Sequence, residues 1–273
     1  MDKQIKAEIG STISFGGYDW RVLDVQDGKA LLLSDKAIET RAYHRTYGVL
    51  TWAECDLRNY LNGEFYDSLG EDRARIATTE IRTRSNPWYG INGGASTDDK
   101  IFLLSIEEVV KYFGDSGQLK NRPDDTWRIS DEYDPARVIT GECGKALSWW
   151  LRSPGCMSAN AVHVGRDGHV CIQGLIVSCP TTGVRTALWL NLQHNDSDRI
   201  KAVALINDSY VRDAQVLTDD PRAVEDYYGD DSNWSDYCGS FFIGIYEGTE
   251  AEIREKAAAY AGVHPNAVNV VGI

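Results

Sequence analysis

The stretch Gly183-Val184-Arg185-Thr186-Ala187-Leu188-Trp189-Leu190-Asn191-Leu192 decides the fold class. Successive side chains of a strand point to opposite faces, so this stretch divides into two sets. One face would carry Val184, Thr186, Leu188, Leu190 and Leu192, and the other Arg185, Ala187, Trp189 and Asn191. The alternation predicts a single half-buried strand from 184 to 192.

Two turn signals predict hairpins elsewhere in the chain. Asp27-Gly28 would join strands at 20–25 and 30–33, because this dipeptide tolerates positive φ. Asp167-Gly168 would turn a second hairpin within residues 161–172.

Two helices are predicted from their first residues. Thr51 begins one, with Glu54 at capping-box spacing, and Ser105 begins the other. Residues 114–146 are rich in Gly, Asp, Pro and Ser and predict a long loop. Strands and helices in this order indicate an α+β fold.

A polar stretch at 194–198 separates a second region of different character. It is predicted to hold strands at 201–206, 241–246 and 267–271 and a helix at 249–260. We therefore expect two domains, residues 1–193 and a small α+β appendage at residues 199–273.

Composition limits the partners. With 28 basic and 41 acidic side chains the chain carries a net charge of −13, which argues against nucleic acid and anionic membranes as partners. A hydrophobic content of 42% is enough for a packed core. The sequence shows neither a signal peptide nor an apolar run of membrane-spanning length, so we expect a cytoplasmic location.

Several motifs in a fixed order carry a family resemblance: Phe15–Leu23, Thr51–Trp52, Leu57–Asn62, Asp99–Ser105, Trp149–Gly155 and Gly183–Trp189. Over residues 8 to 192 the chain resembles a bacterial domain-of-unknown-function family, number 6273. Thr186 departs from the Pro usual in that family. We expect the change to be tolerated, because it restores a backbone donor.

The closing motifs are similar to those of the formylglycine-generating, sulfatase-modifying branch of C-type-lectin-like folds. The variable binding proteins of diversity-generating retroelements share that architecture. The resemblance therefore implies a C-type-lectin-like domain with a twisted antiparallel sheet, two helices and long loops. It supplies no activity, since fold does not imply function.

The cysteines and histidines give little sign of catalysis. None of the six cysteines forms a C-x-x-C pair, so we expect buried free thiols. Formylglycine-generating enzymes hold copper with two cysteines, for which Cys171 and Cys179 are the nearest candidates, but the enzyme's motif is absent. No nucleophile elbow or phosphate-binding glycine motif is present.

His163 and His169, with Cys171 nearby, suggest a zinc site. A two-residue turn at Asp167-Gly168 would pair Val164 with Cys171, which places the two histidines on opposite faces. We therefore expect exposed hairpin histidines and no metal ion.

Acidic residues between Asp219 and Asp236 are better explained as a solvated loop than as a calcium site, because the EF-hand Gly and Glu are missing. The aromatic residues among them favour packing of the appendage slightly over a binding surface. They are Tyr227, Tyr228, Trp234 and Tyr237.

The candidate binding residues are Trp150, Arg152, Arg185 and Trp189. A buried Arg is costly unless paired, so acids or carbonyls should surround Arg152 and Arg185. The four residues form either an architectural cluster or a ligand pocket. We expect no catalytic residue, metal ligand or cofactor.

The leading hypothesis is a non-catalytic module that binds a protein or glycan through loops 84–98 and 114–146 and hairpin 161–180. One alternative is an enzyme, or degenerate enzyme, of the sulfatase-modifying type. Another is a structural or assembly protein of a phage-like or mobile element.

Overall fold

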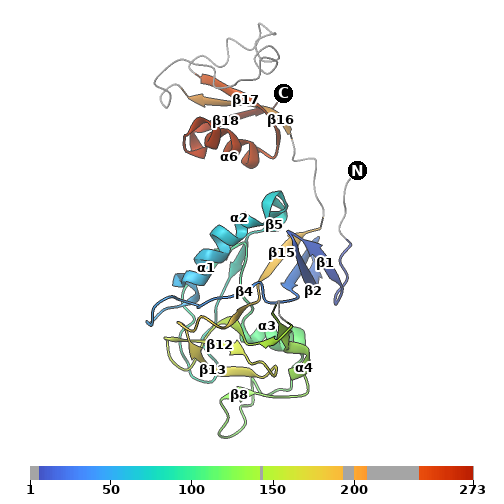
Figure 1. Cartoon of the computed structure of the whole chain (residues 1–273), viewed down its shortest axis with the longest axis vertical. Coiled ribbons are helices and arrows are strands. Elements are labelled where there is room, and N and C mark those ends of the chain that lie inside the picture. The colour runs from blue at the N-terminus through green and yellow to red at the C-terminus, as the bar shows by residue number, and fades with distance from the viewer. Residues whose placement is uncertain (1–5, 142–143, 193–199, 208–239, 273) are drawn as a thin grey trace. The chain divides into compact units, whose positions relative to one another are not determined.

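The computed structural model describes residues 6–141, 144–192, 200–207 and 240–272. The chain divides into two compact units, Lys3–His194 and Asn195–Ile273, the second together with Met1–Asp2. The described part contains mixed sheets and a few helices, which confirms the α+β class (Figure 1).

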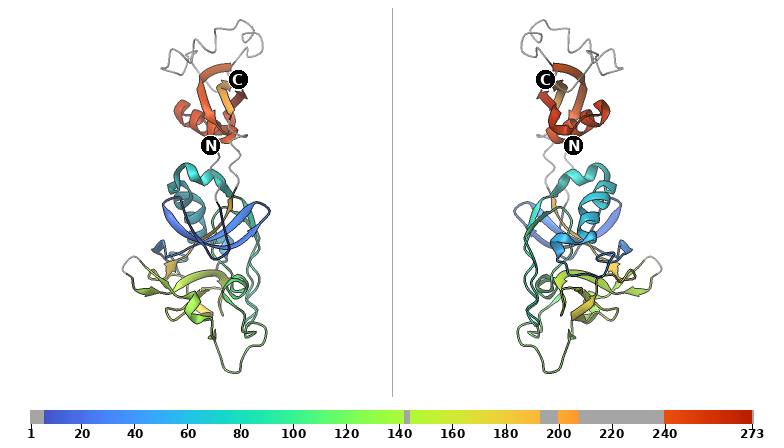
Figure 2. Two further views of the ribbon diagram at one scale, coloured as in Figure 1. Left: turned by 90° about the vertical axis from the view of Figure 1, so that its right-hand side faces the viewer. Right: turned by 90° about the vertical axis from the view of Figure 1, so that its left-hand side faces the viewer.

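The first unit contains a five-stranded antiparallel sheet of order β1-β2-β3-β15-β5. Its strands are β1 (Thr12–Phe15), β2 (Tyr18–Gln26), β3 (Lys29–Ser34), β5 (Ile76–Ala77) and β15 (Ala187–Asn191). The hairpin predicted at Asp27-Gly28 is confirmed: both residues have positive φ, 50° and 72°. Figure 2 shows the strong twist of this β2–β3 hairpin.

A six-stranded sheet of order β4-β14-β11-β12-β13-β8 completes most of this unit. Its strands are β4 (Glu39–Thr40), β8 (Arg128–Ile129), β11 (Trp149–Pro154), β12 (Asn160–Val164), β13 (Val170–Ile176) and β14 (Gly183–Val184). Strands β11 and β14 are parallel, whereas the other neighbours are antiparallel. Two small sheets pair β6 (Thr79–Ile81) with β7 (Thr97–Asp99), and β9 (Ile139–Thr140) with β10 (Ala146–Leu147).

The stretch 183–192 is not one strand, so that prediction is wrong. β14 belongs to the six-stranded sheet and β15 to the five-stranded sheet, with Arg185 and Thr186 as the link. The backbone N–H of Thr186 donates to Ser34 Oγ at 3.2 Å, so the donor that Pro would lack is used. This link therefore connects the two sheets.

The helix predicted at Thr51 is broken into short pieces. The Thr51–Glu54 capping box begins only a 3₁₀-helix, and Cys55 then caps α1 through its sulfur. In chain order the pieces are η1 (Trp52–Glu54), α1 (Asp56–Tyr60), the π-helical η2 (Leu61–Phe65), α2 (Tyr66–Ser68) and η3 (Gly70–Arg75). The second prediction is confirmed: Ser105 caps α3 (Ile106–Phe113). The loop at 114–146 contains α4 (Asp134–Arg137) besides its short strands.

In the second unit every predicted element is present. The described strands form a sheet of order β17-β16-β18, and Thr249 caps the helix with Glu252. The elements are β16 (Ile200–Asn207), β17 (Ser240–Gly248), α6 (Glu250–Ala261), η7 (Pro265–Ala267) and β18 (Val268–Gly272). Ile253, Ala257 and Ala258 of α6 share a small core with this sheet. Among the helices that the structure describes, none has the length and apolar character needed to cross a membrane.

Candidate functional site

Arg152 lies in the interior strand β11 and is almost completely buried. Its guanidinium binds both carboxylate oxygens of Glu108, at 2.5 and 3.0 Å, and the carbonyl of Leu103 at 2.6 Å. The expected acid and carbonyl partners are thus confirmed for Arg152. Glu108 also accepts from the backbone N–H of Ser105 at 2.8 Å, so one carboxylate both caps α3 and neutralises the arginine.

A cavity of about 390 Å³ is lined by both Arg152 and Trp189. A second cavity, of about 310 Å³, is also lined by Trp189, and the two share Thr79 and Glu80. We call this pair of adjoining cavities the Trp189 groove. Two of the four residues selected from the sequence therefore line one groove.

The wall of the groove carries charges of both signs. Glu80 on β6 and Arg82 just after it form an exposed ion pair, with Nε and Oε1 2.9 Å apart. Arg84 and Glu107 also line the cavity. An indole beside paired donors and acceptors can contact a polar ligand through its ring while the charged groups accept and donate hydrogen bonds.

Arg185 does not line the Trp189 groove. Its guanidinium carbon lies 5.4 Å from the Phe113 ring centre and 5.0 Å from that of Trp149, and its Nε donates to the carbonyl of Ser34. Burial lowers the pKa of Arg185 to about 9, and nearby Asp35 opposes that shift, so the group is still cationic at neutral pH. The expected carbonyl partner is present, and its surroundings are those of an architectural residue.

Trp150 is also outside the groove. Its indole N–H donates to the carbonyl of Arg41, and its ring contacts Tyr43. On the other side it packs edge-on against His163, with ring centres 6.3 Å apart. Trp150 therefore lies beside His163 and does not line the Trp189 groove.

The strand pairing of the second hairpin differs from the predicted register. His163 pairs directly with Cys171, and Val164 pairs with Val170. The backbone N–H of Gly165 donates to the carbonyl of His169, so the turn is longer than Asp167-Gly168 alone. A shift of one residue moves side chains to the other face, and the predicted separation of the two histidines is wrong.

His163, His169 and Cys171 each offer one ligand atom, and these atoms all lie within 4.8 Å of one another. We call these three residues the His-Cys cluster. None is exposed, which also corrects the expectation of exposed histidines. Burial, and secondly the neighbouring His169, lower the pKa of His163 to about 4, so its imidazole is neutral at pH 7. The cluster could have been found from the sequence only with the correct turn length.

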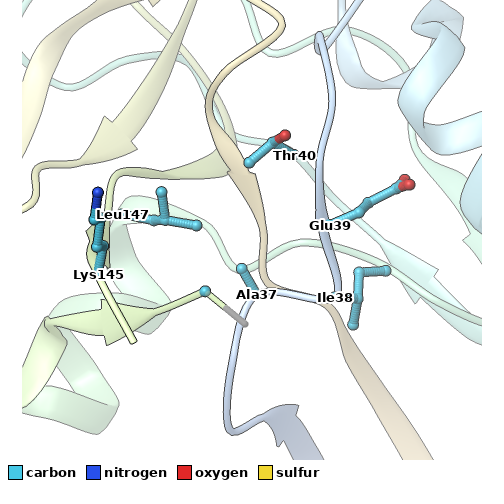
Figure 3. Close-up of a pocket in the computed structure, with 7 residues that line it drawn as sticks. Ala37, Ile38, Glu39, Thr40, Lys145 and Leu147 are labelled. Atoms are coloured by element: carbon cyan, nitrogen blue, oxygen red, sulfur yellow. The ribbon is translucent and has the colours of Figure 1, made fainter. Parts of the chain in front are cut away.

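A third cavity, of about 390 Å³, contains none of the predicted residues. It lies between β4 and the strand β10, with Glu39 and Thr40 on one side and Lys145 and Leu147 on the other (Figure 3). The Glu39 carboxylate is already bound by Arg41 at 2.6 Å. No sequence motif identified this cavity.

The cysteines that the structure describes are free, but the prediction that they are buried holds only for two of the four. Cys55 and Cys171 are buried, whereas Cys156 and Cys179 are half-buried. The two cysteines considered for copper have different polar neighbours: Cys171 lies near the Gly174 carbonyl, and Cys179 near Thr181 and Thr182. Cys143, Cys238 and the acidic and aromatic residues of 219–237 lie outside the described residues.

Comparison with known proteins identifies one family. Residues 27–192 match the model described as a domain of unknown function (DUF6273). Searches of curated proteins and of solved structures found no match.

Proposed function

Because the chain belongs to the DUF6273 family, whose description carries no activity, we propose from its own geometry that it is a non-catalytic ligand-binding module. The ligand is a glycan or a protein segment bound in the Trp189 groove. The observation that carries this proposal is that Arg152 and Trp189 line the same cavity. For the fold, we propose a C-type-lectin-like domain at residues 1–193 and a separate small domain at residues 199–273.

The chemistry of the groove favours a glycan. Trp189 offers an aromatic surface, while Glu80, Arg82 and Glu107 offer hydrogen-bonding groups around it. Arg152 also lines the cavity; its Nε is buried without a hydrogen-bond partner among the described residues, and its charge is balanced by Glu108. A largely preformed wall of this kind limits the entropy lost on binding.

The test begins with the full-length chain on glycan and peptide arrays, followed by titration calorimetry with each ligand found. Trp189→Ala should weaken binding at least about tenfold, since an aromatic contact of this size contributes more than 1 kcal/mol. Trp127→Ala is the matched control, because Trp127 is exposed and lines neither cavity of the groove.

Equal loss of binding in both variants would place the ligand elsewhere. Turnover of a bound ligand that depends on Arg152 or Trp189 would overturn the non-catalytic assignment and favour an enzyme. A peptide ligand sensitive to Trp189→Ala would keep the groove and replace the glycan.

A further inference from the structure

The His-Cys cluster lies where two strands and their turn converge. His163 on β12 and Cys171 on β13 occupy directly opposite positions of the antiparallel pair. His169 lies in the turn just before β13, two residues before Cys171, and its ligand atom lies within 4.8 Å of those of His163 and Cys171. All three side chains thus project from one face of the hairpin, and backbone hydrogen bonds across the turn fix their spacing.

The spacing matches a small coordination sphere. Zinc bonds of 2.0–2.3 Å in a tetrahedron place ligand atoms roughly 3.3–3.8 Å apart. The three ligand atoms lie within 4.8 Å of one another. Small side-chain rotations that move these atoms by about 1 Å would bring them to the spacing of a zinc site. Among the described residues this is the one group of three or more such side chains found at that spacing.

The surroundings of the two histidines fit the role of ligands. Asp167 Oδ1 contacts His169 Nδ1, and a carboxylate on one ring nitrogen orients the other nitrogen towards a metal ion. The Nδ1 atom of His163 is buried and has no hydrogen-bond partner among the described residues. Such an atom is costly unless a ligand or ion completes it.

Neighbouring aromatic rings and charged groups surround the His-Cys cluster. Trp127 packs edge-on against His169, and Trp150 against His163, with ring centres 5.6 and 6.3 Å apart. The positive charge of Arg128 disfavours a metal ion nearby. Arg128 lies beside Asp167, with Nη1 and Oδ2 3.9 Å apart, and its guanidinium stacks on Trp127. A thiolate at Cys171 and the carboxylate of Asp167 supply two negative charges against the three positive charges of a divalent ion and this arginine.

We infer that His163, His169 and Cys171 bind a divalent transition-metal ion of the zinc class, with Asp167 as the positioning residue of His169. Two imidazoles and one thiolate form a donor set suited to Zn²⁺. Three protein ligands leave one tetrahedral position for a water molecule or a ligand atom. On binding, a sulfur–metal bond replaces the S–H bond of Cys171, one proton passes to the buffer, and no electron is transferred.

The test uses the full-length chain without an affinity tag, stripped of metal and then titrated with Zn²⁺ or Co²⁺. We expect one ion per chain, and with Co²⁺ a thiolate-to-cobalt charge-transfer band together with the visible spectrum of a tetrahedral site. Cys171→Ser should remove that band. His163→Gln and His169→Gln should weaken Zn²⁺ binding by more than about 100-fold, and Asp167→Asn by about 10- to 100-fold, as for other outer-shell partners.

The matched controls are Cys179→Ser and His44→Gln, which should bind as the unchanged chain does. Cys179 is half-buried beside Thr181 and Thr182, and His44 lies 3.2 Å from Asp56, both outside the cluster. A cobalt band that survives Cys171→Ser, or is lost in Cys179→Ser, would overturn the site. If a variant fails to fold, an anomalous peak between the three side chains in crystals of the unchanged zinc-loaded chain supports the site, and its absence overturns it.

Discussion

Arg137 is a fully buried charge, and its neutralisation depends on two aspartates. Its side chain is fully buried and lies 2.9 Å from Asp131 and 3.1 Å from Asp134, and it also donates to the carbonyl of Gly114. These contacts hold α4 against the end of α3. A buried cation that loses one partner is left with uncompensated charge, which usually costs about 3–5 kcal/mol.

We therefore expect Asp131→Asn to lower the free energy of unfolding by about 3 kcal/mol, the lower end of that range, because Asp134 remains. Urea unfolding measures it. Glu80→Gln is the control, since it breaks the exposed pair with Arg82 and should leave the free energy of unfolding almost unchanged. Equal effects of the two substitutions would contradict the special role of burial.

The same aspartate predicts a pH dependence. Burial acts to raise the pKa of Asp131, but hydrogen bonds from Ser116 and Arg137 outweigh it, so the pKa lies below its usual value. A carboxylate with a lowered folded-state pKa stabilises the fold above its unfolded pKa of about 3.9 and loses this effect as the pH falls through its folded value. Stability should thus fall below about pH 4, with a smaller fall in Asp131→Asn, as denaturant titrations at several pH values would show. Identical pH profiles would exclude Asp131 as a contributor.

At the scale of elements, the turn between β12 and β13 depends on Gly168. Its φ is +93°, and a Cβ placed there would lie 1.8 Å from the carbonyl oxygen of Asp134. Gly168→Ala should therefore lower the free energy of unfolding by at least about 2 kcal/mol, through left-handed strain and the clash together. Thermal and urea unfolding provide the measurement.

Gly28 provides the matched control. Its φ is +72°, yet a Cβ there meets nothing within 4 Å. Gly28→Ala should cost only the backbone strain, about 1 kcal/mol. If Gly168→Ala costs no more than this, the approach of Asp134 to the turn is not what fixes its conformation.

Elements with local signals could be predicted from the sequence, whereas long-range partners could not. The Asp27-Gly28 turn and the caps at Ser105 and Thr249 depend on residues within one turn, and all three are present. The dipeptide Asp167-Gly168 signals a turn without giving its length, so the face of His163 was mispredicted. Alternation along 183–192 likewise does not state to which sheet each half belongs.

The residues of the candidate site also divide into features that local sequence predicts and features that depend on distant segments. An arginine in a buried strand predicts a partner, and Arg152 has Glu108. The sequence does not give the identity of that partner or the convergence of Arg152 with Trp189, because both depend on contacts between distant segments. Arg185 and Trp150 resemble them in composition and yet lie in other surroundings.

At the scale of the whole molecule, the two units have separate cores. The larger core gathers residues from Phe15 to Leu190, and the smaller one, in the described part, consists of Ala204, Ile253, Ala257, Ala258 and Val268. A chain ending at His194 should thus keep a cooperative unfolding transition with the same midpoint as that of the larger unit in the full chain. Circular dichroism and calorimetry measure it.

The control is a chain ending at Thr182, which lacks β14 and β15 and should not fold cooperatively. A chain ending at His194 that fails to fold would show that the larger unit depends on the remainder, against the proposed domain boundary.

The strand β15, which follows the link at Arg185 and Thr186, is the last strand of its sheet to be synthesised on the ribosome. β15 pairs with β3 on one side and β5 on the other, so these early strands keep open edges until the last strand of the unit has emerged. Open strand edges in a nascent chain invite pairing with other chains. The unit should therefore complete its folding late, and the exposure of these strand edges to other chains should end only when residue 191 has left the exit tunnel.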